Sequence, residues 1–116
     1  MANTFKVKTN AAMPASSGTP LTLYTCPSST QTIVIGLTLC NVHTTSVTAD
    51  VQLVSDTSDT ETNANVELVT NAPIPAGGSL ETLGGGKLVL QTTDVLKVTS
   101  DTASSIDVAL SIMEIT

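Results

Sequence analysis

The residue types that most often carry out covalent chemistry are scarce in this chain. It has one histidine, His43, and two cysteines, Cys26 and Cys40. A cysteine beside a histidine can act as a nucleophile and its base. Cys40 and His43 are three residues apart, but the apolar run that holds Cys40 ends before His43, and no third residue is placed to orient the imidazole. We therefore interpret His43 as an ordinary loop residue, and the sequence predicts a protein that is not an enzyme.

Metal ligands are also thinly spread along the chain. A zinc site needs about four Cys, His or carboxylate ligands in clustered spacing, and two cysteines with one histidine do not supply them. Asp56, Asp59 and Glu61 lie in an acidic segment, SDTSDTETNAN at 55–65, and offer the oxygen ligands that calcium prefers. An EF-hand calcium loop needs a glycine at its turn, and this segment contains none. We therefore predict an exposed acidic loop and no cofactor, with calcium binding as the alternative.

A glycine-rich segment at 84–87, GGGK, superficially resembles a phosphate-binding loop. It lacks the GxxxxGK[ST] spacing, and an apolar run typical of a strand follows it, where a phosphate loop would lead into a helix. We predict a connection between two strands. Asp94 and Asp101 flank other apolar runs, where aspartate commonly stabilises a turn through hydrogen bonds to the backbone.

The composition indicates an all-β chain. With 116 residues it is long enough for one domain with a core of its own. Apolar residues make up 41% of the chain and aromatic residues only 2%, so that core must consist of Val, Leu and Ile. Threonine is the commonest residue, and β-branched side chains fit a pleated sheet better than a helix.

Alternation of apolar and polar residues marks about eight short strands, separated by turns rich in Pro, Gly, Asn and Asp. The expected strands are 21–24, 32–42, 47–54, 65–70, 79–83, 87–91, 95–99 and 106–112. Their spacing predicts a single-domain β-sandwich over 19–116, with immunoglobulin-like and jelly-roll topologies both open.

The segment 32–42 is the most apolar of these strands. A strand that is apolar on both faces is central in a sandwich or covered by a partner. Gly36 predicts a bulge or a close backbone approach within it. The two expected faces are Ile33, Ile35, Leu37 and Leu39 on one side, and Val34, Gly36, Cys40 and Val42 on the other.

Residues 1–18 have two interpretations: a first edge strand of the same sandwich, or an arm that orders against a neighbouring subunit. Phe5 and Val7 alternate with Lys6 and Lys8, as in a strand. Phe5 is the only phenylalanine, and the two lysines could meet an acidic protein surface. These four residues are therefore the candidate partner contacts.

The chain has few charged residues, and this limits what its surface can bind. Charged residues make up 12% of the chain, against roughly 25% in ordinary soluble domains, and the net charge is −6. This favours a surface partly covered by partner proteins, with a hydroxyl-rich free surface as the alternative. An acidic chain with four lysines is a poor nucleic-acid binder.

The sequence shows no pattern typical of a membrane span or a signal peptide. No apolar run approaches the roughly 18 residues of a membrane span, and residues 1–18 lack the apolar segment of a signal peptide. We therefore expect synthesis in the cytoplasm of the producing cell, with Cys26 and Cys40 most simply reduced, although their pairing stays open.

Several sequence motifs together suggest a family. They are MANTFK at the start, LYTCP at 23–27, TIVIGLTLCN at 32–41, NAPIPAGGSL at 71–80, GGGKLVLQTTDVLKVTSDTASSIDV at 84–108 and the terminal MEIT. In these the chain resembles a family of small virion structural proteins of tailed phages, notably those of marine bacteria and cyanobacteria.

The resemblance implies a virion component. The leading expectation is a capsid decoration, or cement, protein that binds the outer surface of the major capsid protein shell as a homo-oligomer, taken as a trimer. The acidic net charge argues against contact with the packaged DNA, which places the protein outside the shell. The alternative is a tail or fibre module whose acidic loop at 55–65 recognises a host surface.

Overall fold

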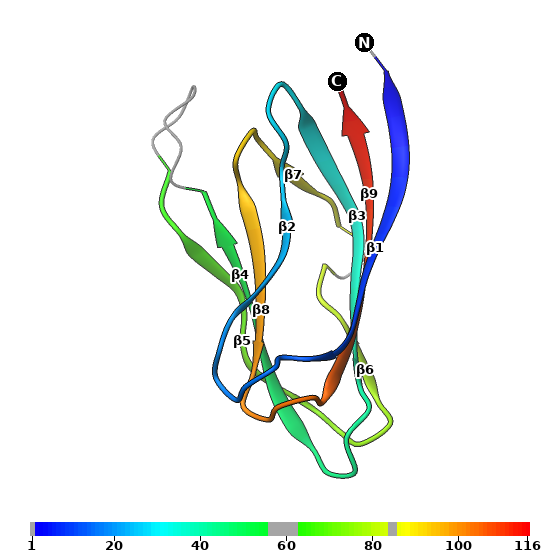
Figure 1. Cartoon of the computed structure of the whole chain (residues 1–116), viewed down its shortest axis with the longest axis vertical. Helices are drawn as coiled ribbons and strands as arrows, with labels where there is room; N and C mark the ends of the chain where they lie inside the picture. Colours follow the sequence, from blue (N-terminus) through cyan, green and yellow to red (C-terminus); the bar gives the residue numbers. More distant parts are fainter. Residues whose placement is uncertain (1, 56–62, 84–85) are drawn as a thin grey trace.

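A computed structural model describes residues 2–55, 63–83 and 86–116. In this part of the chain the structure has nine strands and no helix, arranged as two antiparallel sheets that pack face to face (Figure 1). The predicted all-β sandwich is therefore confirmed. No helix in these ranges could span a membrane. The strands are β1 (Asn3–Met13), β2 (Leu21–Thr25), β3 (Gln31–Asn41), β4 (Val47–Val54), β5 (Val66–Ile74), β6 (Ser79–Glu81), β7 (Leu88–Leu90), β8 (Val95–Ser100) and β9 (Ile106–Ile115).

The strand order is that of a jelly roll. The first sheet runs β1-β9-β3 and ends on β6 and β7, which pair with opposite ends of β3 and so share one strand position. The second sheet runs β2-β8-β4-β5. Most connections therefore cross from one sheet to the other, as in the double Greek key of jelly rolls. This order differs from the ABED and CFG sheets of an immunoglobulin domain, and it decides between the two predicted topologies.

The core lies between the inner faces of the two sheets, and β9 shows how it is built. Ile106, Val108, Leu110 and Ile112 are each at most 3% exposed, while the residues between Ile106 and Ile112 alternate outward. The predicted alternation of this strand is confirmed, and the strand continues three residues further than expected. The core consists mainly of Val, Leu and Ile, as the composition predicts, and also contains Met13, Cys26 and Ala49.

The predicted faces of the central strand β3 are wrong in one half. A bulge between Val34 and Gly36 shifts the register against β9, and a bulge interrupts the alternation of side chains. Val34 therefore faces the core together with Leu37, both at most 1% exposed, whereas Ile33 and Ile35 lie on the outer face. The bulge that Gly36 predicted is confirmed, but the face assignment did not allow for it.

β1 and β5 extend the sheets beyond what the sequence pattern predicts. The segment with two interpretations, strand or arm, forms β1, which pairs with β9 and runs from Asn3 to Met13. β5 continues to Ile74, past its expected end at residue 70. Pro73 is tolerated there because β5 lies at the edge of its sheet, where no further strand needs its missing N–H.

The Pro/Gly segment before β6 forms a tight turn in which Gly77 is left-handed. The Gly78 N–H donates to the Pro75 carbonyl at 2.8 Å, and Gly77 has a φ of +75°. Replacing Gly77 with alanine should lower the free energy of unfolding by about 1 kcal/mol, because a Cβ is strained in this left-handed conformation. Urea denaturation measures the change.

The matched control for Gly77→Ala is Gly36→Ala. A Cβ at Gly36 would meet nothing closer than 4.0 Å, and its backbone is not left-handed. This control should not lower stability, and it should raise the free energy of unfolding by up to about 1 kcal/mol, because alanine restricts the unfolded chain more than glycine does. Equal losses in the two variants would contradict the proposed strain at Gly77.

Candidate functional site

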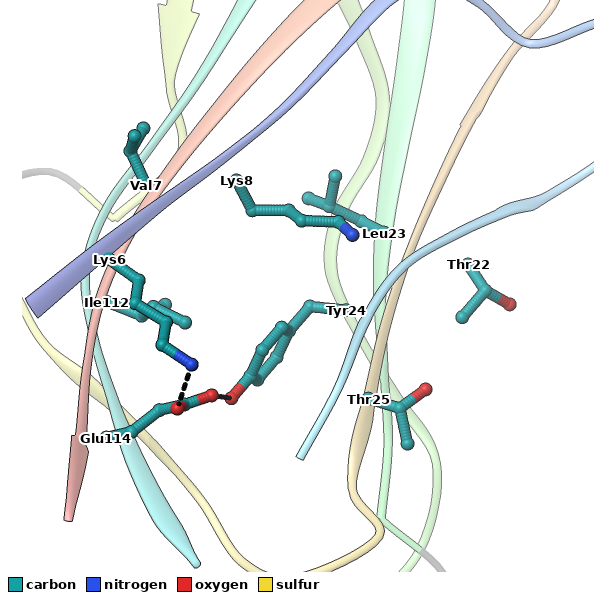
Figure 2. A pocket seen from close by; sticks show the side chains of 9 residues that line it. All are labelled: Lys6, Val7, Lys8, Thr22, Leu23, Tyr24, Thr25, Ile112 and Glu114. Atoms are coloured by element: carbon teal, nitrogen blue, oxygen red, sulfur yellow. Dashed lines mark hydrogen bonds and ion pairs between the residues drawn. The ribbon is translucent and has the colours of Figure 1, made fainter. Parts of the chain in front are cut away.

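The four predicted contact residues lie on β1 and separate into two pairs. β1 pairs with β9, and its side chains alternate between the two faces of the first sheet. Phe5 and Val7 point to the outer face and are 73% and 68% exposed. Figure 2 shows Lys6 and Lys8 extending the other way, into the cleft between β1 and β2. One strand thus supplies two different surfaces.

An apolar row crosses the outer face of the first sheet. Phe5 pairs with Met113 of β9, Met113 pairs with Ile33 of β3, and Ile33 pairs with Val89 of β7. Residues directly opposite in antiparallel strands point to the same face and contact each other. We call these four residues the outer apolar row. Phe5 and Val89, at its two ends, are 73% and 59% exposed.

Beside this row the paired positions on the outer face are apolar or carry hydroxyl groups. Val7 and Ile35, 68% and 41% exposed, lie next to it, and the following rank of paired residues is Thr9, Ala109 and Thr38. Within the described strands, acidic residues reach this face at Glu81, which is paired with Thr38 in that rank, and at Asp107, further along β9. Their carboxylates accept hydrogen bonds: Glu81 from the Thr38 hydroxyl and the Leu37 N–H, and Asp107 from the Ala12 N–H.

The outer face of the second sheet is different. Its β8 and β4 strands present Lys97 opposite Gln52 and Thr99 opposite Asp50, and Lys97 is also paired with Thr22 of β2. A polar outer face of this kind is normal for an antiparallel sheet exposed to water. The molecule therefore has one solvated outer face and one outer face that carries the outer apolar row, with acidic residues in its described strands at Glu81 and Asp107.

The cleft between β1 and β2 contains a polar cluster that links the two sheets (Figure 2). The Lys6 ammonium lies 2.8 Å from Oε1 of Glu114, and the Tyr24 hydroxyl donates to Oε2 at 2.6 Å. Glu114 is 7% exposed, and Tyr24 also contacts the Thr32 hydroxyl at 2.9 Å. Hydrogen bonds from Lys6 and Tyr24 lower the pKa of Glu114. Burial, and then the Glu114 carboxylate, raise the pKa of Tyr24.

The two lysines of the cleft differ in their partners. Lys6 is engaged within the chain by Glu114, so its charge is not wholly available to a partner protein. Lys8 makes no ion pair within the described ranges. The cleft holds a cavity of about 420 Å³, and the Tyr24 side chain of β2 lines it opposite the lysines. The cleft therefore presents one paired and one available positive charge.

The residues considered for covalent chemistry are dispersed. His43 contacts Thr45 through Nδ1 at 3.1 Å. Cys26 is buried, its thiol donates to the Thr30 carbonyl, and burial raises its pKa, which disfavours the reactive thiolate. Cys40 is half-buried, and both thiols are free. The structure does not bring these residues together into a nucleophile and base.

The structure describes only some of the acidic residues that the sequence suggested as metal ligands or turn residues. Asp56, Asp59 and Glu61 lie outside the described residues, so their proposed loop is not placed. Among the residues that are described, no three His, Cys, Asp or Glu side chains could hold a metal ion. The turn role of Asp94 is confirmed, since it accepts a hydrogen bond from the Gln91 N–H. Asp101 instead accepts from the Thr48 N–H on a neighbouring strand.

Sequence reasoning missed Glu114 and Tyr24. A signal for Glu114 was present, because it continues the inward-facing positions of Leu110 and Ile112 at a spacing of two. A carboxylate at an inward position needs a partner. The sequence does not indicate which residue that partner is, because Tyr24 is 90 residues away along the chain.

These features define a small jelly-roll domain with one solvated and one apolar outer face. By sequence, the chain matches no family model and no curated protein.

Proposed function

We propose that this protein is a structural component of a tailed-phage virion, and that it decorates the outer surface of the capsid shell. The observation that carries the proposal is the outer apolar row, Phe5, Met113, Ile33 and Val89, which itself contains no charged residue. Contiguous exposed apolar surface on a soluble domain commonly marks a protein interaction site. The partner in this proposal is the major capsid protein.

The energetics favour a protein partner for this face. Covering exposed apolar surface stabilises a complex by about 25 cal/mol per Å². The row itself contains no charged group, so covering it adds no desolvation cost for an unpaired ion. A stable interface buries roughly 800 Å² on each partner, and the molecule measures 45 by 27 by 24 Å, so one sheet face offers enough area.

Two further properties agree with a position outside the shell. The net charge of −6 disfavours contact with packaged DNA. The jelly roll recurs in viral capsid and lectin domains, although fold by itself does not determine function. In the proposal, copies of the protein form a homo-oligomer, taken as a trimer, at junctions between shell subunits. Because it binds only assembled shells, it stabilises them by mass action.

A tail or fibre module with host-surface recognition is the second candidate. The observation that favours it is a hollow of about 490 Å³ beside the end of β4, lined in part by Ser55, Asn63 and Gln91. Hydroxyl and amide groups of this kind hydrogen-bond to carbohydrates. The apolar outer face favours the shell-binding proposal over this one.

Localisation on the particle separates the two candidates. An antibody against the protein should label heads in electron micrographs, and particles produced without it should lose infectivity faster on heating and osmotic shock. Labelling confined to tails would replace the decoration role with the fibre role. Unchanged resistance of head-labelled particles would remove the cementing function.

A further inference from the structure

β1 leaves one edge of the first sheet without a partner. Ala2 and Thr116 exchange both backbone hydrogen bonds, at 3.0 and 2.9 Å, where β1 meets β9. Such pairs alternate along an antiparallel ladder, so the backbone groups of Phe5, Val7 and Thr9 point away from β9. In the part of the chain that the structure describes, no strand pairs with this edge. It therefore presents a row of unused donors and acceptors.

The side chains of β1 restrict which strand can add to this edge. Charged residues that point inward on an edge strand discourage pairing with a like strand. If two copies met through β1 in an antiparallel register centred on Val7, Lys6 of each would lie opposite Lys8 of the other. Like charges directly opposite are unfavourable. The edge thus disfavours this self-pairing and favours a strand that carries negative charge.

The cleft beside the edge supplies the matching site for that negative charge. An added strand would meet Phe5 and Val7 at hydrogen-bonded positions, and Lys6 and Lys8 at the positions between them. Side chains approach most closely at these non-hydrogen-bonded positions. Lys8 has no ion pair in the described ranges, and the Lys6 side chain, 53% exposed, retains free surface. The cavity of about 420 Å³ gives acidic side chains room beside both lysines.

The opposite face of the added strand would extend the outer apolar row. Residues paired with Phe5 and Val7 point to the outer face of the sheet, where apolar side chains pack best. We propose that the free edge of β1 binds, by strand addition, an extended protein segment in which acidic and apolar residues alternate. This inference rests on the proposed function only for the identity of the partner, because that function makes the shell protein the one that carries the segment.

A synthetic peptide tests the strand addition directly. The probe is a labelled peptide, Thr-Val-Glu-Val-Glu-Val-Thr, with blocked ends, titrated with the full chain at low ionic strength and followed by fluorescence anisotropy. We expect saturable binding that Lys8→Glu weakens on the order of fivefold or more, since an attractive cross-strand pair becomes repulsive. The same peptide with lysine in place of glutamate should bind far less.

The matched control is Lys97→Glu, which makes the same charge change on the solvated outer face of the second sheet. It should leave peptide binding unchanged. Amide hydrogen exchange should slow at Phe5, Val7 and Thr9 when the peptide is added. Absence of saturable binding, equal losses in the two variants, or protection confined to other strands would overturn the proposal. The outer apolar row would remain free to bind a shell in each of these cases, so the two proposals fail separately.

Discussion

Replacing Phe5 and Val89 together with glutamate should weaken binding of the protein to capsid shells by about a hundredfold or more. These residues form the two ends of the outer apolar row and are 73% and 59% exposed, so the substitutions leave the core intact. Full burial of one large apolar side chain contributes about 1.5–3 kcal/mol. Burying a carboxylate without a partner adds a further cost. A hundredfold loss corresponds to about 2.8 kcal/mol, which is within the sum of these effects.

Cosedimentation with shells prepared without the protein measures this loss. The matched control is Thr22→Glu with Thr99→Glu, which adds the same two charges to the outer face of the second sheet. The control pair should bind like the parent protein. If both pairs of substitutions weaken binding equally, general charge repulsion explains the result and the outer apolar row is not the contact surface.

Replacing Glu114 with alanine should lower the free energy of unfolding by about 2–3 kcal/mol. Glu114 is 7% exposed and accepts from Tyr24 at 2.6 Å while pairing with Lys6 at 2.8 Å. A hydrogen bond to a charged group contributes about 1.5–3 kcal/mol. The Lys6 pair contributes less, because the lysine is half exposed and water can replace its partner. The loss of Tyr24's acceptor therefore dominates the effect, which urea denaturation measures.

The effect of Glu114 should depend on pH in a defined direction. Hydrogen bonds from Lys6, and then from Tyr24, hold the folded-state pKa of Glu114 below its ordinary value, which is about 4.3. Its stabilisation is thus complete above that ordinary value and is lost as pH falls through the lower folded value. The stability difference between the parent and Glu114→Gln should shrink across this range. The exposed Glu67→Gln is the control, and a difference that is constant from neutral to acidic pH would contradict the assignment.

The predicted alternation succeeded wherever a strand is uninterrupted. In β4, the alternating set Val47, Ala49, Val51 and Leu53 is expected to face inward, and the first three are buried while Leu53 is half-buried. In β9 the residues that face inward are correct from Ile106 onward. It failed in β3, where the bulge at Gly36 moved Ile33 and Ile35 to the outer face. A local pattern indicates which residues share a face, but only while the backbone adds no extra residue.

The candidate site was predicted in part. The sequence identified Phe5 and Val7, and their alternation with Lys6 and Lys8 already separated apolar from charged side chains. It did not identify Met113, which lies between Phe5 and Ile33 on the same face. The alternation in β9 identifies its inward residues. Outward positions on a strand are normally solvated and carry little information about partners.

The sequence by itself determined the all-β class, the aliphatic core and the low charge of the surface, because these depend on composition and on a period of two along each strand. Only the tertiary structure decided the jelly-roll order and the register that aligns Phe5, Met113, Ile33 and Val89. It likewise placed Tyr24 beside Glu114. The physical reason is that a strand's own residues set which side chains point inward, whereas the choice of neighbouring strand and register depends on packing between segments far apart in the chain.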